Sequence, residues 1–342
     1  MDIVILAVLL VIGFIVAFAI GSNDETMSPA VGAKVFSLKA AVLLGAFINL
    51  IGAAFLGGGV SEKVGSDLVS GNILSIDMVL AILISMAIWL LVASSTKGLP
   101  ISTTQCIVGS VIGVALVAPA AGLLGWGVGA IDWQVMLQIF LGWVVSPIIG
   151  FLISGVFISL IRNILRKARG FTGRERIEQI AAYGLAVFLI VTGLSRGGND
   201  VANAVAPMVN LEGFQTTFNV GPISIPGALI PLIVGGLGMG LGLIVVGRKV
   251  IRTLATEVVT LEPTTALAAS ISVSLVMFIG TLLGFPLSGT HVLVAALIAV
   301  GYVAKTPVKM KQVRDILISW VVTVPISAFL GAMVFAVVIM VF

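Results

Sequence analysis

The chain contains very few charged residues. Asp, Glu, Lys and Arg make up 9% of its 342 residues, whereas hydrophobic residues make up 59%. Soluble domains average about 25% charged residues, so the composition excludes an ordinary soluble domain. Several hydrophobic runs exceed about 18 residues, which is long enough for a helix to cross a bilayer. The sequence therefore predicts a membrane protein that crosses the bilayer many times.

Cysteine and histidine are almost absent. The single cysteine, Cys106, excludes a disulfide framework and a cysteine-based zinc site, and His291 is the only histidine. The sequence also lacks a Walker motif, a nucleophile elbow and a zincin motif. These absences argue against ATP-driven transport and hydrolysis, and we expect neither an enzyme nor a bound cofactor.

Ten hydrophobic segments form two sets of five, on either side of a basic stretch. The first set lies at about 3–20, 38–57, 78–96, 99–118 and 133–161, and the second at about 180–195, 226–246, 264–283, 285–304 and 313–342. We expect an all-α polytopic membrane protein. A first transmembrane repeat would cover 1–161, a basic cytoplasmic loop 162–179, and a second repeat 180–342.

Two motifs occur once in each half. Gly21-Ser-Asn-Asp24 corresponds to Gly197-Gly-Asn-Asp200, and the element Gly98–Gln105 corresponds to Gly284–His291. The motifs come in the same order in both halves, which indicates an internal repeat. Because Gly and Pro interrupt hydrophobic segments at matching places, we expect broken or re-entrant helices at the centre, as in secondary transporters.

The basic residues are distributed unevenly over the connections between segments. With the N-terminus outside, the inner connections would hold Lys34, Lys97, the Arg162–Arg176 cluster, Arg248, Lys249, Arg252, Lys305, Lys309, Lys311 and Arg314, and the outer ones Lys63 and Arg196. Cytoplasmic loops carry an excess of Lys and Arg, so we predict both termini outside and no nucleic-acid partner. An odd number of crossings per half would give two repeats of inverted topology.

The Asn-Asp motifs combine carboxylates with amide and hydroxyl oxygens. A carboxylate at membrane depth costs about 2.5–3.5 kcal/mol, and a bound cation offsets this cost. Hard oxygen ligands suit alkali and alkaline-earth ions, so we expect a cation site, with helix capping as the alternative. The candidate metal ligands are Asn23, Asp24, Thr26, Ser28, Asn199, Asp200 and Asn203.

Hydroxyl residues follow the Gly-x-Pro sequence in each half. A helix that begins there points free N–H groups and its positive dipole end at the break, and the hydroxyls add further donors for an oxyanion. Capping by Ser or Thr is again the alternative, and packing is the alternative role for the histidine. The candidate anion ligands are Ser102, Thr103, Thr104, Gln105, Ser288, Gly289, Thr290 and His291.

At these residues the chain resembles the inorganic phosphate transporter (PiT) family, the sodium- or proton-coupled phosphate symporters. The family's duplicated signature reads Gly-Ala-Asn-Asp-Val-Ala-Asn-Ala, with Gly-x-Pro-Val-Ser-Thr-Thr-His further on. Gly198–Ala204 matches the first element almost completely, whereas the first copy continues after Asp24 with Glu25-Thr-Met-Ser. The second element has Gln105 in place of His in one half and Gly289 in place of Thr in the other.

The resemblance implies a plasma-membrane symporter that takes up inorganic phosphate with sodium ions by alternating access. The Ser/Thr elements would then hold phosphate, the Asn-Asp motifs would hold sodium, and the protein would form a homodimer in the lipid bilayer. A sulfate permease or a proton-coupled phosphate symporter would share this architecture. A passive anion channel fits less well, since buried acidic residues that need a cation suit coupled transport better than a hydrated pore.

Overall fold

The computed structural model describes residues 3–65, 67–69, 74–96, 100–168, 170–209, 211–220 and 223–341, so Lys97 and Gly98 lie outside the described residues. The helices are α1 (Ile3–Ser22), α2 (Ser28–Gly32), α3 (Leu38–Leu56), α4 (Gly58–Gly65), α5 (Ile76–Thr96), α6 (Thr103–Val117), α7 (Trp133–Lys167), α8 (Gly170–Val209), α9 (Leu229–Gly242), α10 (Arg248–Glu257), α11 (Pro263–Leu282), α12 (Gly289–Ala304) and α13 (Met310–Val341). A π-helical turn, Leu243–Gly247, joins α9 to α10.

The ten predicted segments each coincide with a helix. In the described part of the chain, nine helical stretches are long and apolar enough to cross a membrane, and α12 is a shorter apolar helix. Many outward-facing side chains are large and apolar, among them Leu152 on α7 and Phe329 on α13, as expected for helices that face lipid. The prediction of a helical, multi-pass membrane fold is confirmed.

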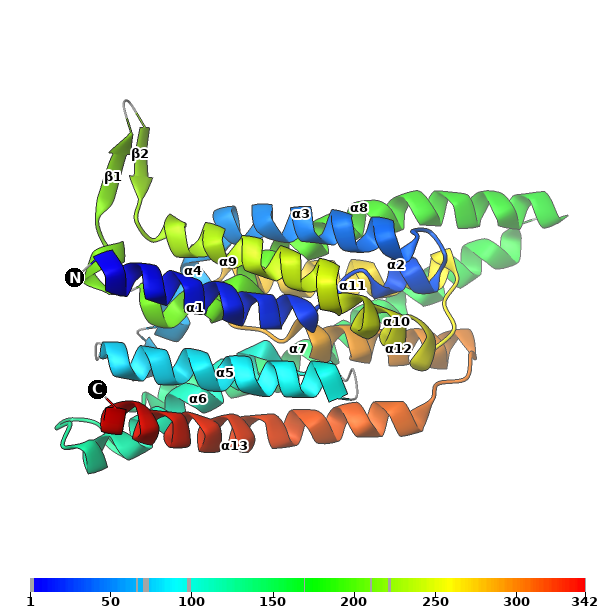
Figure 1. The fold of residues 1–342 in the computed structure, drawn as a ribbon. Helices are drawn as coiled ribbons and strands as arrows, with labels where there is room; N and C mark the ends of the chain where they lie inside the picture. Colours follow the sequence, from blue (N-terminus) through cyan, green and yellow to red (C-terminus); the bar gives the residue numbers. More distant parts are fainter. Residues whose placement is uncertain are drawn as a thin grey trace.

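One small element was not expected, a β-hairpin between α8 and α9. Strand β1 (Thr217–Val220) pairs antiparallel with β2 (Ile223–Pro226), with Thr217 opposite Pro226. The strands contain β-branched residues and the sequence between them is Gly-Pro, which favours a hairpin. The hairpin projects from the end of the bundle at which α1 begins (Figure 1).

The bundle has two distinct ends. Helix α1 begins and α13 ends at the same end, whereas the connection from α7 to α8 lies at the opposite end (Figure 1). The structure differs here from the expected loop over 162–179, because α7 continues to Lys167 and α8 starts at Gly170. The stretch is rich in Arg and contains no proline, so both helices extend past the rest of the bundle.

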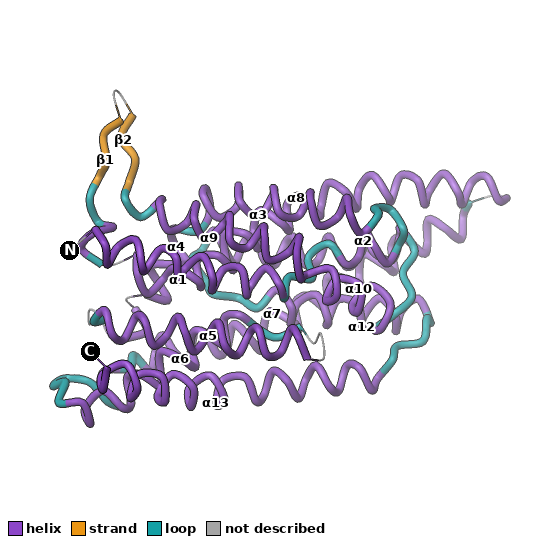
Figure 2. The backbone as a smooth tube through the Cα atoms, in the orientation of Figure 1, coloured by secondary structure: helices purple, strands orange, loops and turns teal. Residues whose placement is uncertain are grey.

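Helices α6 and α12 begin inside the protein. Each follows an irregular stretch of chain after Pro100 or Pro286, and the stretch ahead of α12 runs through the middle of the bundle (Figure 2). Ser102 and Ser288 cap the two helices, accepting hydrogen bonds from the N–H groups of Gln105 and His291 at 3.3 and 3.4 Å. The duplicated Gly-x-Pro elements therefore place two helix N-termini in the interior, as predicted for broken helices.

The two Asn-Asp motifs lie in different local structures. The first is at a true break between α1 and α2, but the second lies within the continuous helix α8, so the predicted second break is wrong. Pro29 stands at the start of α2, where it prevents α1 from continuing because it lacks an N–H group. The corresponding position in the second half is Val205, which permits a helix.

Glycines allow two pairs of helices to approach backbone to backbone, α1 with α9 and α3 with α8. Between α1 and α9, a Cβ atom added at Gly21 would lie 1.9 Å from the Met239 backbone oxygen, and one added at Gly242 would lie 2.0 Å from that of Phe18. Between α3 and α8, a Cβ atom added at Gly197 would lie 2.3 Å from the Asn49 backbone oxygen, and one added at Gly52 would lie 2.1 Å from that of Leu194. Gly21 and Gly197 open the duplicated motif, and Phe18 and Leu194 each stand three residues before them. The two helix pairs thus make matching contacts.

Candidate ion and oxyanion site

Asp24 is buried in the break between α1 and α2, with 2% of its surface exposed. One carboxylate oxygen accepts hydrogen bonds from the Thr26 backbone N–H and hydroxyl, at 2.9 and 2.5 Å. The other accepts from the Asn49 amide on α3 at 2.7 Å. The carboxylate therefore shapes the turn as a cap would, while its oxygens face a polar interior.

The two motif asparagines have equivalent roles. The Asn23 amide donates to the Ile101 carbonyl at 2.8 Å, and the Asn199 amide donates to the Phe285 carbonyl at 2.9 Å. Both acceptors lie in the irregular stretches that lead into α6 and α12. Each Asn-Asp motif thus positions the Gly-x-Pro element of its own half.

Asp200 connects the halves. One carboxylate oxygen accepts a hydrogen bond from the Thr103 hydroxyl, at the N-terminus of α6, at 2.9 Å. The other accepts from Nε and Nη2 of Arg196 at 3.2 and 3.0 Å. An Arg four residues before an Asp lies on the same helix face, so α8 itself brings this pair together.

The charge pattern predicted Arg196 in an outer connection, and this prediction is wrong. Arg196 lies within α8, with only 3% of its surface exposed. Besides Asp200, its guanidinium contacts Glu25 at 2.5 Å and Asp24 at 3.9 Å. Three buried carboxylates surround one cation, and this charge pairing is what allows Arg196 to lie in the interior.

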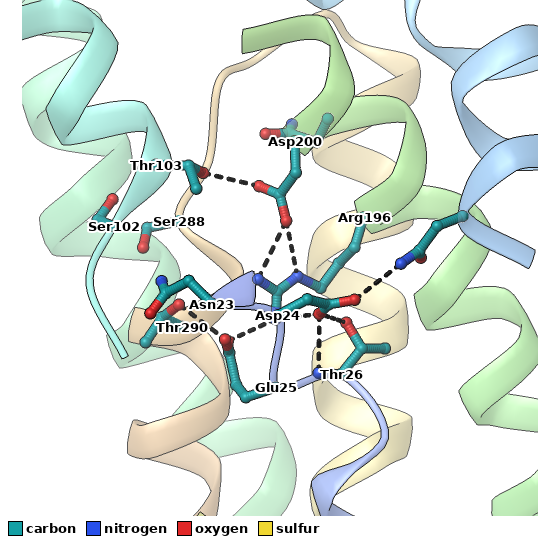
Figure 3. Close-up of polar contacts among 12 residues, drawn as sticks. Asn23, Asp24, Glu25, Thr26, Ser102, Thr103, Arg196, Asp200, Ser288 and Thr290 are labelled. Atoms are coloured by element: carbon teal, nitrogen blue, oxygen red, sulfur yellow. Dashed lines mark hydrogen bonds and ion pairs between the residues drawn. The ribbon is translucent and has the colours of Figure 1, made fainter. Parts of the chain in front are cut away.

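Glu25 completes a continuous chain of side chains. Its carboxylate is fully buried and accepts hydrogen bonds from Arg196 at 2.5 Å and from the Thr290 hydroxyl on α12 at 2.8 Å. The chain runs from Thr103 through Asp200, Arg196 and Glu25 to Thr290 (Figure 3). It joins the N-terminus of α6 to that of α12, so the two predicted anion elements converge on the predicted cation motifs.

The other predicted anion ligands lie around this chain. The Ser102 and Thr104 hydroxyls are hydrogen-bonded at 2.9 Å. Gln105 Oε1 is buried without a partner among the described residues. The His291 ring contacts α7 and α13, with Nδ1 at 3.4 Å from the Trp143 carbonyl and the ring centroid 3.8 Å from that of Trp320.

Three predicted cation ligands have unsatisfied polar atoms. The Ser28 hydroxyl, Asn199 Oδ1 and both amide atoms of Asn203 are buried without a hydrogen-bond partner in the described part of the chain. Buried polar groups are rarely unpaired, and an exception commonly marks a missing ion or water. The oxygen atoms among them are free to serve as cation ligands.

Sequence reasoning missed Glu25, Arg196 and Asn49 as site residues. Two signals were present: Glu25 adds a second acid directly after Asp24, and Arg196 precedes Asp200 by one helical turn. Asn49 gave no local signal, because it lies in an apolar helix and reaches Asp24 only through the packing of α3.

The chemistry of the site is that of paired ions. If all three carboxylates are ionised, the one guanidinium leaves an excess of negative charge that cations can neutralise. No group of three or more His, Cys, Asp or Glu side chains arranged to hold a metal was found among the described residues. A cation here would therefore need hydroxyl, amide and backbone oxygens besides a carboxylate, which is the donor set that hard cations accept.

The fold and this buried site define a class of protein. Helices that begin at membrane depth and point their N-termini at a charged centre are typical of secondary transporters. The chain belongs to the phosphate transporter family, whose sequence profile matches residues 20–331. This match confirms the resemblance seen in the motifs.

Relatives cover nearly the whole chain. A putative phosphate permease of Thermococcus kodakarensis is 30% identical over 98% of this chain and 98% of its own length. The chloroplastic inorganic phosphate transporter 2-1 of Arabidopsis thaliana is 28% identical over 94% of this chain and 70% of its own. A solved structure described as the sodium-dependent phosphate transporter is 27% identical, with a TM-score of 0.84 over 99% of this chain and 100% of the other.

Proposed function

We propose that this protein is a secondary active symporter that takes up inorganic phosphate together with sodium ions by alternating access. The observation that carries the proposal is the convergence of the α6 and α12 N-termini on buried carboxylates, through the bonds from Thr103 to Asp200 and from Thr290 to Glu25. The similarity of this chain to a solved structure described as the sodium-dependent phosphate transporter supports the choice of phosphate and sodium.

The oxyanion would bind between the N-termini of α6 and α12. Free N–H groups and helix dipoles favour negative charge there, and hydroxyls add directional donors. We propose that its ligands come from Ser102, Thr103, Thr104, Gln105, Ser288, Gly289, Thr290 and His291. Phosphate is preferred over sulfate, because phosphate can carry protons and donate hydrogen bonds to neighbouring carboxylates, whereas sulfate at neutral pH cannot.

Sodium would bind beside the oxyanion, at the Asn-Asp motifs. We propose ligands from Asn23, Asp24, Thr26, Ser28, Asn199, Asp200 and Asn203. The unpartnered oxygens of Ser28 and Asn203 support this assignment. A cation next to a buried phosphate offsets the large cost of burying the anion alone.

The architecture suits alternating access. We propose that residues 1–161 and 180–342 are two inverted repeats that move relative to each other around the central site, and that the protein is a homodimer in the plasma membrane. The matching glycine contacts of α1 with α9 and of α8 with α3 support the repeat. The end that carries the α7–α8 connection would face the cytoplasm, since Arg162, Arg166 and Lys167 lie there.

Uptake into proteoliposomes tests this function. We expect radiolabelled phosphate to accumulate when an inward sodium gradient is imposed, and excess unlabelled sulfate to compete poorly. Uptake that follows a proton gradient without sodium would replace sodium coupling with proton coupling. Preferential uptake of sulfate, or gradient-independent equilibration of phosphate, would contradict the proposal.

A further inference from the structure

Three positions at which the two halves of the sequence differ meet at one point of the structure. By the alignment of the duplicated motifs, Arg196 corresponds to Ile20, Glu25 to Val201 and Gly289 to Thr103. Two of these differences introduce opposite charges into the interior, and the third removes a side chain. Because these three differences lie together, they can act as one functional unit that depends on the asymmetry between the halves.

Gly289 makes room for the Arg196 guanidinium. A Cβ atom at position 289 would lie 2.6 Å from Nε and 2.9 Å from Cζ of Arg196, so a threonine like Thr103 would overlap the guanidinium. Gly289 is the first residue of α12. The guanidinium thus lies against the positive end of a helix dipole, a poor place for a cation unless an anion lies with it.

The Glu25 carboxylate is that anion. It accepts a hydrogen bond from the Thr290 hydroxyl, at the start of α12, at 2.8 Å and another from Nη1 of Arg196 at 2.5 Å. These are the contacts that an oxyanion would make at this helix N-terminus. Glu25 therefore occupies part of the proposed phosphate site with an oxyanion of the protein's own.

Arg196 likewise occupies a cation position. Two of its N–H groups bind Asp200, at 3.2 and 3.0 Å, and its Nη1 lies 3.9 Å from Asp24. A cavity of about 10 Å³ beside it, lined in part by Thr26, Thr192 and Ser270, has room for about one water. The internal pair thus fills space that transported ions would need.

We propose that Glu25 and Arg196 are substrate-site residues that stand in for the two transported ions when the site is empty, and that phosphate and sodium enter by exchanging partners with this pair. The proposal rests on the proposed function and adds two residues to its site. Phosphate at Thr290 displaces Glu25 and receives Arg196, whose planar guanidinium suits bidentate binding of phosphate. Sodium receives the carboxylates that Arg196 leaves.

The exchange explains why the two ions would bind together. If phosphate alone entered, the Glu25 carboxylate would lose its partners while buried. If sodium alone displaced Arg196 from Asp200, the guanidinium would be left underpaired. An uncompensated buried charge is strongly unfavourable, so each ion raises the affinity for the other, and the coupling is reciprocal.

The test replaces each charged residue with its counterpart from the other half. The double variant Glu25→Val/Arg196→Ile removes one negative and one positive charge, so the net charge is unchanged. We would titrate purified protein with inorganic phosphate by calorimetry, with and without sodium, and take the ratio of the two Kd values. The sodium effect should fall by at least about tenfold, the size of one charge-assisted hydrogen bond.

A milder variant keeps the test decisive if the double variant does not fold. Glu25→Asp retains the charge but is one methylene shorter, so it cannot hold Thr290 and Arg196 as Glu25 does, and the sodium effect should fall in the same direction. Ser110→Ala is the control. It removes a buried hydroxyl whose hydrogen-bond partner is Ser85, at 3.0 Å, and not a residue of the ion pair. The ratio of the two Kd values should therefore be unchanged.

The outcomes separate this inference from the proposed function. If wild-type protein bound phosphate without any effect of sodium, the proposed sodium coupling would fail. If wild-type protein showed the sodium effect and the folded variants retained it in full, the internal ion pair would be only structural and the inference would be wrong, with the proposed function intact.

Discussion

The Thr103 hydroxyl donates a hydrogen bond to the Asp200 carboxylate at 2.9 Å, although the two residues come from opposite halves of the chain. Thr103 is the first residue of α6, where an oxyanion is expected, and Asp200 belongs to the motif where a cation is expected. Any ion that changes the partners of Asp200 therefore changes what Thr103 can offer to an anion. This contact gives the two proposed binding sites a direct physical connection.

The first prediction concerns that carboxylate. Asp200→Asn keeps the shape of the side chain but removes the charge that would hold sodium and that now pairs with Arg196. We expect the sodium concentration for half-maximal uptake to rise by about tenfold or more, because a hydrogen bond to a charged group contributes about 1.5–3 kcal/mol. Phosphate affinity at saturating sodium should change less.

Asp24→Asn is the matched variant for this test. Its effect on sodium dependence should be smaller, since Met27 stands where the family signature has an asparagine and the Asp24 oxygens already serve Thr26 and Asn49. If Asp200→Asn kept the wild-type sodium dependence, the carboxylate would be a structural cap and not a sodium ligand.

The second prediction concerns the hydroxyls at the two helix N-termini. The double variant Thr104→Val/Thr290→Val preserves side-chain shape and removes two donors that lie near the buried ends of α6 and α12. Each lost bond to a charged oxyanion should weaken binding by about 1.5–3 kcal/mol. Because two bonds are lost, we expect phosphate affinity to fall by at least about a hundredfold in a binding assay.

The control for the hydroxyl prediction is Thr323→Val. Thr323 is a fully buried threonine on α13 that accepts a hydrogen bond from Trp89 at 3.3 Å, remote from the chain of ion pairs. Its replacement should leave phosphate affinity unchanged. Equal affinities for the double variant and wild type would remove these hydroxyls from the site.

Much of the fold could be predicted because its signals are local. Hydrophobic length identifies a spanning helix such as α3 without knowledge of its neighbours. Ser102 and Ser288 cap α6 and α12 because proline and glycine end the preceding structure and a hydroxyl starts the next. Such features depend on a few adjacent residues, and the sequence contains them all.

The charge pairing at the centre could not be predicted in the same way. Whether Arg196 lies in a loop or in the interior depends on Glu25. Glu25 belongs to the other half of the chain and contacts Arg196 only after the two halves pack together. The continuity of α8 through its motif has a local basis instead, because Val205 stands where the first half has Pro29. Tertiary contacts decided the pairing of Arg196.

The third prediction concerns orientation. In a Cys106→Ala background, Phe171→Cys places a thiol at an 87% exposed position near the start of α8, on the end expected to face the cytoplasm. A membrane-impermeant maleimide should not label it in intact cells but should label it after permeabilisation. Leu124→Cys, at a 96% exposed position between α6 and α7, should be labelled in intact cells, and the reverse pattern would invert the topology.

The fourth prediction concerns the close packing of α3 and α8, which positions Asn49 against Asp24 and α8 with its Asp200. A Cβ atom at Gly52 would lie 2.1 Å from the Leu194 backbone oxygen, and backbone cannot move aside as a flexible side chain can. Gly52→Ala should therefore lower the melting temperature of the detergent-solubilised protein, by the equivalent of about 1–3 kcal/mol for overpacking. It should also weaken phosphate binding, because separating the helices disturbs the Asp24 and Asp200 carboxylates.

Gly155→Ala is the matched control, since Gly155 is helical and has no atom within 4 Å of the added Cβ. There alanine should keep or raise the melting temperature, as alanine favours a helix over glycine by about 1 kcal/mol. If the two variants melted alike, the close approach of α3 and α8 would not be a determinant of stability.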